Sequence, residues 1–128
     1  MHEVAIVTGL LLLELSWFSA MVGKARAQNG VSAPAMSGNE DFERRCRIHQ
    51  NTVEQLIIFL PAMWLFAMYV HQIGAAALGL VFFAGRLMYS SAYAADPSKR
   101  AAGFLVGYAA QAILLLGGLG AAMWTYFQ

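Results

Sequence analysis

The sequence has few of the features that mark a water-soluble protein. Of its 128 residues only 12% are charged while 59% are hydrophobic, and the formal net charge is +1. This composition excludes an ordinary globular domain, in which about 25% of residues are charged. A net charge so close to zero gives no pull towards nucleic acid. The single cysteine, Cys46, excludes an internal disulfide, and the lack of a Cys/His/carboxylate cluster argues against a metal site.

Four long apolar segments take up nearly all of the chain, at residues 4–23, 53–70, 73–95 and 101–127. Each is close to the ~20 residues that a helix needs to cross ~30 Å of hydrocarbon. The sequence therefore predicts an all-α membrane protein in which one domain, residues 1–128, forms a bundle of four transmembrane helices at about 4–27, 40–70, 73–95 and 97–127. We expect the first segment to be retained as a helix rather than cleaved as a signal.

Positive residues gather on two of the three connections between these segments. Those flanking the first connection are Lys24, Arg26, Arg44, Arg45 and Arg47, and those following the third segment are Lys99 and Arg100. Because positive residues concentrate on cytoplasmic connections, both termini are expected to face outward. Small residues also crowd the later helices, with Gly103 and Gly107 in G-x-x-x-G spacing. Such residues allow close approach of helices in lipid, which favours a tight bundle and an oligomer.

Polar residues form stripes on the second and third predicted helices. On the second helix the stripe is Arg47, Asn51 and Glu54, at i, i+4 and i+7, and on the third it is Arg86, Tyr89 and Tyr93, at i, i+3 and i+7. Helical spacing places each set on one face. Arginine suits carboxylates and glutamate suits an amine. The two stripes together therefore predict a site for a zwitterionic, peptide-like ligand.

Two further arginines lie where a charge needs an explanation. Arg86 is expected ~14 Å deep by helical rise, where a lone charge costs at least ~2.5–3.5 kcal/mol. Glu14, midway along the first helix, and Glu54 are its candidate partners, and both a structural ion pair and a direct ligand role stay open. Arg100 is expected one turn into the last helix, near the level of Tyr93. A guanidinium at a helix N-terminus stabilises a bound thiolate.

Three runs of residues together resemble a known family. They are Phe42 to Glu54, then Gly85 to Tyr89 with Tyr93, then Asp96 to Arg100. In order and spacing these runs resemble the membrane-associated proteins in eicosanoid and glutathione metabolism, the MAPEG family. The resemblance implies a four-helix bundle assembled as a homotrimer, with glutathione as the co-substrate and no metal. It also implies that glutathione is held at subunit interfaces near the cytoplasmic face.

The resemblance also implies roles for individual residues. The residues implied to bind glutathione are Arg47, His49, Asn51, Glu54 and Tyr89, with Arg86 and Tyr93 lining or supporting that site. Arg100 resembles the arginine that stabilises the glutathione thiolate, and Arg26 resembles a second catalytic arginine near the acceptor. The implied partners are a second and third copy of the chain, the lipid bilayer and a small hydrophobic electrophile. The compact loops and short tail are typical of a bacterial member, which predicts the bacterial inner membrane.

The leading hypothesis is a glutathione-dependent transferase or peroxidase that acts on a hydrophobic electrophile from the bilayer. One alternative is a non-catalytic, lipid-binding scaffold of the same family, against which the retention of Arg100 argues. A second alternative is a small proton-coupled multidrug antiporter. Such four-helix transporters also place a membrane-embedded glutamate in the first helix, as Glu14 stands here.

Overall fold

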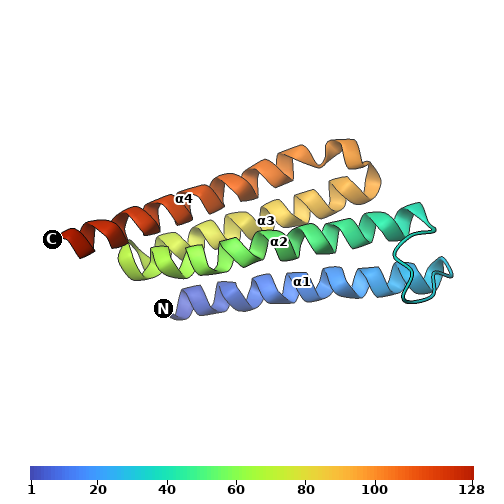
Figure 1. The fold of residues 1–128 in the computed structure, drawn as a ribbon, viewed down its shortest axis with the longest axis horizontal. Helices are drawn as coiled ribbons and strands as arrows, with labels where there is room; N and C mark the ends of the chain where they lie inside the picture. The colour runs from blue at the N-terminus through green and yellow to red at the C-terminus, as the bar shows by residue number, and fades with distance from the viewer.

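Four long helices run side by side along the molecule. They are α1 (His2–Gln28), α2 (Glu40–Tyr69), α3 (Gln72–Ala95) and α4 (Ala101–Phe127), and each reverses the direction of the one before it (Figure 1). The structure is a computed structural model that describes residues 1–128. All four helices are long and apolar enough to cross a membrane. This confirms the predicted all-α architecture, and the protein is an integral, multi-pass membrane protein.

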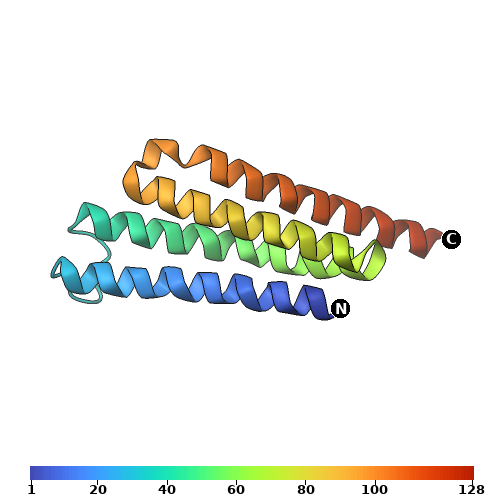
Figure 2. The same ribbon diagram turned by 180° about the vertical axis from the view of Figure 1, so that it is seen from behind.

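Side chains just before α2 and α3 fix where those two helices begin. The Asn39 side chain accepts a hydrogen bond from the Phe42 amide at 3.0 Å, so α2 begins at Glu40. The His71 Nδ1 atom accepts from the Gly74 amide at 2.9 Å, so α3 begins at Gln72, one residue before the predicted start at residue 73. Such caps satisfy amides that have no partner within the helix. Both ends of the chain lie at one end of the bundle, opposite the α1–α2 and α3–α4 connections (Figure 2).

The last helix departs from the expected boundary. A helix beginning at residue 97 was expected, but Pro97–Lys99 form a short 3₁₀ turn and α4 begins at Ala101. The reason is local, because the Asp96 side chain caps this turn by accepting from the Ser98 amide at 3.0 Å. The tighter turn changes the direction of the chain before α4 and sets Arg100 at the junction.

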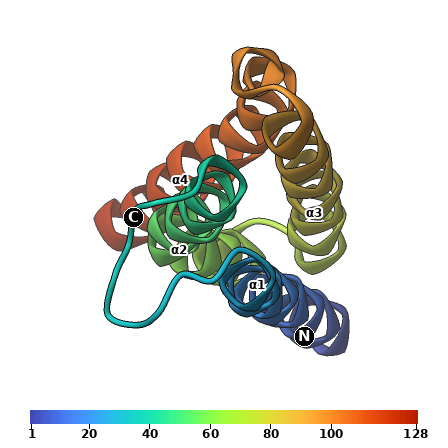
Figure 3. The same cartoon turned by 90° about the vertical axis from the view of Figure 1, so that its right-hand side faces the viewer.

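The pair α2 and α3 forms the centre of the bundle. Helices α1 and α4 each pack against α2 and α3 rather than mainly against each other (Figure 3). In the core, the rings of Phe59 on α2 and Phe82 on α3 stack with their centroids 3.9 Å apart. Between α1 and α2, the Trp64 indole donates to the Thr8 hydroxyl at 3.0 Å. Helices α2 and α3 therefore form the centre of the core, and both outer helices pack against this pair.

Glycines allow α3 and α4 to touch through their backbones. A Cβ atom placed on Gly103 would overlap the backbone nitrogen of Tyr89 and would lie 2.7 Å from the carbonyl oxygen of Gly85. A Cβ atom on Gly107 would lie 3.2 Å from the ring of Phe82. The G-x-x-x-G pair is therefore used within the chain, for the contact that brings the start of α4 against Tyr89.

We expect Gly103→Ala to destabilise the protein, because the added methyl group has no space between two backbones. Overpacking of this kind costs ~1–3 kcal/mol. The matched control is Gly120→Ala on the same helix, where an added Cβ meets nothing within 4 Å. Thermal unfolding of both variants in the same detergent measures the difference. Equal melting temperatures for the two variants would contradict the backbone contact.

Candidate functional site

The centre of the polar region is Arg86 of α3, whose side chain is only 1% exposed. Its Nη2 atom donates to the Asn51 side-chain oxygen at 2.8 Å and to the Thr52 hydroxyl at 3.0 Å, both on α2. Its guanidinium carbon lies 4.1 Å from the centroid of the Tyr89 ring. These contacts confirm that the polar faces predicted on α2 and α3 meet inside the bundle.

The expected carboxylate partners of Arg86 are not in contact with it. The ion pairs of the structure are the N-terminal amine with Glu3, Arg44 with Glu40, and Arg45 with Asp41. Neither Glu14 nor Glu54 forms an ion pair with Arg86, so the expectation of a direct pair is wrong. The reason is that an amide and a hydroxyl of α2 already supply acceptors at hydrogen-bonding distance.

Beside Arg86, a pocket of about 630 Å³ opens where α2, α3 and the start of α4 meet. Five of its lining residues were predicted from the sequence: Arg47, Asn51, Tyr89, Tyr93 and Arg100. Four were not predicted as site residues: Ser98, Ala101, Phe104 and Leu105. Phe104 and Leu105 follow Arg100 by one turn of α4, so helical spacing from Arg100 was the signal that would have found them. The lining carries two arginines and no carboxylate, which suits an anionic ligand.

A capped turn holds Arg100 at this pocket. The Asp96 carboxylate accepts hydrogen bonds from the backbone amide and from the hydroxyl of Ser98, at 3.0 and 2.8 Å. These bonds hold the pKa of Asp96 below its ordinary value, so the cap keeps its charge until the pH falls below the usual carboxyl range. The Arg100 guanidinium in turn donates to the Pro97 carbonyl at 2.7 Å. The guanidinium is exposed, and its charge is available to a ligand.

Aromatic rings and a further arginine shape the same end of the bundle. The Tyr89 ring lies between those of Tyr93 and Phe104, with centroid distances of 5.6 and 6.4 Å.

Arg44 of α2, expected only to set topology, donates to the carbonyl oxygens of Ala94 and Ala95 at 3.2 and 3.5 Å. A cation at a helix C-terminus satisfies carbonyls that have no partner within the helix. Arg44 therefore ties the start of α2 to the end of α3.

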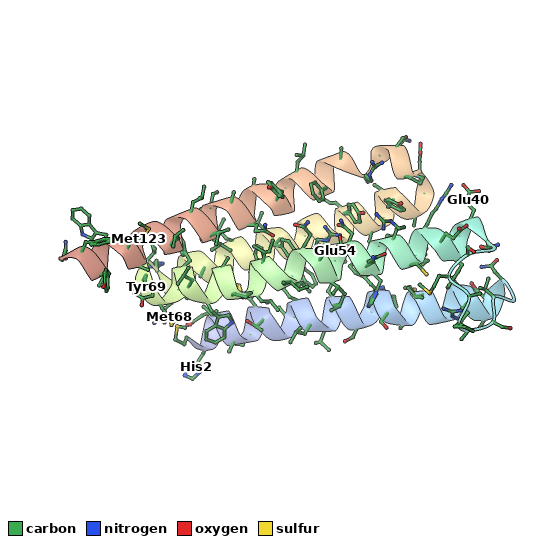
Figure 4. The ribbon with its side chains drawn as sticks, in the orientation of Figure 1. His2, Glu40, Glu54, Met68, Tyr69 and Met123 are labelled. Carbon is green, nitrogen blue, oxygen red and sulfur yellow. The ribbon has the colours of Figure 1, made fainter.

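The structure does not place all of the predicted residues at this pocket. Arg26 of α1 turns to the α1–α2 connection, where it donates to the Ala35 carbonyl at 2.8 Å and lies 4.6 Å from the centroid of the Phe42 ring. His49 lines a separate pocket of about 380 Å³ with Val22, Met36, Cys46, Gln50 and Val53. Glu54 is exposed and lines neither pocket. In Figure 4 it lies part-way along α2, away from the end that begins at Glu40.

Comparison with known proteins adds evidence of a different kind. A model of the MAPEG family matches residues 4–120. The chain is 43% identical over 124 residues to an uncharacterized protein of the cyanobacterium Synechocystis, covering 97% of this chain and 90% of that one. It is 40% identical over 119 residues to human microsomal glutathione S-transferase 2, covering 92% and 81%. It is 37% identical over 136 aligned positions to rat leukotriene C4 synthase, covering 97% and 91%.

The hydrogen bonds of Arg86 lead to a prediction about stability. Thr52→Val keeps the shape of the side chain but removes one of the two acceptors of a buried guanidinium. We expect a loss of ~1–3 kcal/mol, seen as a lower melting temperature in detergent. The matched control is Thr125→Val, because the Thr125 hydroxyl is exposed and bonds only to the Ala121 carbonyl of its own helix, at 3.0 Å. If Thr52→Val melted at the same temperature as Thr125→Val, the anchoring role of Thr52 would be wrong.

Proposed function

The chain belongs to the MAPEG family, and we propose that it is a glutathione-dependent transferase or peroxidase acting on a hydrophobic electrophile that reaches it from the bilayer. The observation that carries the proposal is the pocket in which Arg47, Asn51, Tyr89, Tyr93 and Arg100 come together. Membership of the MAPEG family argues against the alternative of a multidrug antiporter, which rested on Glu14 alone. The proposed location is the bacterial inner membrane, with the pocket towards the cytoplasm and both termini outward.

Each end of glutathione has a suitable residue in this arrangement. Its two carboxylates suit the guanidinium of Arg47 and the amide of Asn51, since arginine binds carboxylates through paired hydrogen bonds. Its ammonium suits Glu54, a carboxylate further along α2 that lies outside the pocket lining of its own chain. The rings of Tyr89 and Tyr93 form the wall between them, and Arg86 supports that wall from behind through Asn51 and Tyr89. The sulfur would then lie towards Arg100.

The chemistry follows from a cation beside the sulfur. An ordinary thiol has a pKa of ~8.5, and lowering it by two units takes ~2.7 kcal/mol, which one close cation supplies in a partly dry site. The thiol proton passes to solvent. In transfer, the thiolate sulfur bonds to the electrophilic carbon and the leaving group departs. In peroxide reduction, two glutathiones and one hydroperoxide give glutathione disulfide, an alcohol and water.

Arg26 and His49 lie outside the pocket of their own chain, and we propose that they complete the pocket of a neighbouring copy. This proposal assigns the chain to a homotrimer whose sites lie between subunits. Two features support it. His49 lines the separate pocket under the α1–α2 connection, and the Arg26 guanidinium lies 3.7 Å from the sulfur of Met36 in that lining. This pocket shares no lining residue with the Arg100 pocket. A head-to-tail contact in a closed ring would bring the two surfaces together three times.

The thiolate assignment predicts that Arg100→Ala lowers the rate of glutathione conjugation to 1-chloro-2,4-dinitrobenzene by about 25-fold at pH 7, because a rise of two pKa units, from ~6.5 to ~8.5, lowers the thiolate fraction from about three-quarters to about 3%. The ultraviolet absorbance of the bound thiolate should disappear as well, while Arg100→Lys should keep part of both signals. The control is Lys99→Ala, which removes a neighbouring exposed cation that does not line the pocket.

A wild-type conjugation rate in Arg100→Ala would sink the thiolate assignment. Calorimetry tests the scaffold alternative separately. Glutathione that fails to bind the wild-type protein at millimolar concentration would favour a scaffold over an enzyme.

The shared site predicts rescue between two impaired variants. Arg26→Ala and Arg100→Ala should each have strongly reduced activity alone, because each lacks one arginine at every site. When the two chains are co-expressed and mix at random, about a quarter of the sites contain both arginines, so up to about a quarter of the activity should return. Activity of the purified mixed protein, with each chain carrying a different affinity tag, measures this. No recovery in a protein shown to contain both chains would mean that the two arginines do not act at a shared site.

A further inference from the structure

Glu14 of α1 is the buried acidic group that the proposed function does not use. Its side chain is 5% exposed, and both carboxyl oxygens are buried without a hydrogen-bond partner. Burying a carboxyl group in this way is costly unless a proton or an opposite charge compensates it. Because burial of this carboxyl group in the middle of a membrane helix is unfavourable, we expect Glu14 to have a function.

The packing of α1 against α3 places Glu14 at the level of Arg86. Glu14 lines a cleft of about 330 Å³ together with Phe83 and Leu87 of α3, which stand three residues before and one residue after Arg86. The two helices run in the same direction (Figure 1). One turn further along α1, Phe18 packs in the same cluster as Tyr89. Glu14 stands about one turn before Phe18, and Arg86 stands about one turn before Tyr89. Because Phe18 and Tyr89 pack together, Glu14 and Arg86 lie at the same level of the bundle.

The two groups also complement each other electrically. Glu14 is the only charged residue that lines this cleft, and Arg86 is the charged residue of α3 that stands between Phe83 and Leu87 in the sequence. Arg86 itself has two neutral acceptors and no carboxylate in contact, and its Nε atom has no partner. A buried carboxyl group and a buried guanidinium at one level, each with an atom that lacks a hydrogen-bond partner, influence each other strongly where water is scarce.

We propose that Glu14 is a positioning residue, which acts across the α1–α3 interface to hold the Arg86 guanidinium against Asn51 and Tyr89. It does so without direct contact. Because Asn51 and Tyr89 line the pocket, Glu14 determines how firmly the binding face for glutathione is held. The consequence for glutathione rests on the proposed function, whereas the coupling between Glu14 and Arg86 does not.

The coupling is tested by the reactivity of Glu14 towards dicyclohexylcarbodiimide. This lipid-soluble reagent attacks a protonated carboxyl group: the acid proton moves to a carbodiimide nitrogen, the carboxyl oxygen bonds to the central carbon, and the adduct rearranges to a stable N-acylurea. A nearby cation favours the ionised, unreactive form. We expect Glu14 labelling at about pH 9, followed by mass spectrometry, to be up to about tenfold faster in Arg86→Met than in the wild type, and close to wild type in Arg86→Lys. Equal labelling in all three proteins would overturn the coupling.

The positioning role is tested by kinetics that need no Arg86 variant. In Glu14→Gln, which keeps the size of the side chain, we expect the KM for glutathione to rise about tenfold with a smaller change in kcat, because Arg100 lies at another part of the pocket. Glu3→Gln is the control, a charge change at the exposed start of the same helix. An unchanged KM in Glu14→Gln would overturn the positioning role. A wild-type protein without glutathione turnover would instead refute the proposed function and leave the labelling result decisive for the coupling.

Discussion

The structure depends on the burial of one guanidinium between two helices. Arg86 is nearly inaccessible, and its hydrogen bonds to Asn51 and Thr52 fix α3 against α2 in both rotation and depth. A charge within a membrane helix is tolerated only where polar groups surround it. No other arrangement of the two helices would give Arg86 these same acceptors. The arginine that is expensive to bury therefore determines which faces of α2 and α3 meet, and places Tyr89 and Asn51 on one wall.

Close contact between backbones supplies the rest of the site. Gly103 of α4 lies against Gly85 and Tyr89 so tightly that no side chain fits. This contact brings the start of α4 beside the wall formed by α2 and α3, and the turn capped by Asp96 sets Arg100 at that junction. The two devices differ in kind. Hydrogen bonds of Arg86 hold the wall formed by α2 and α3, while small residues bring Arg100 beside it.

The sequence predicts the four helices well and the side-chain contacts between helices poorly. Four spans follow from hydropathy, and helical spacing correctly groups Arg47 with Asn51 and Arg86 with Tyr89. Spacing identifies a face of a helix but not its rotation against a neighbour, so Glu14 and Glu54 were preferred as partners of Arg86 over Asn51 and Thr52. For the same reason the contact of Arg44 with the end of α3 was missed. The start of α4 was misplaced because the cap at Asp96 opens a 3₁₀ turn first. The roles of Arg26, His49 and Glu54 remain predictions, since they involve a ligand and further copies of the chain.

The central claim is that one pocket binds glutathione with its sulfur at Arg100 and its carboxylates towards Arg47. Electron cryo-microscopy of the protein with glutathione in lipid nanodiscs tests this most directly. The account predicts density for the tripeptide along Arg47, Asn51, Tyr89 and Tyr93, with the sulfur within hydrogen-bonding distance of the Arg100 guanidinium. Glutathione bound elsewhere, or bound in this pocket with its sulfur turned away from Arg100, would contradict it.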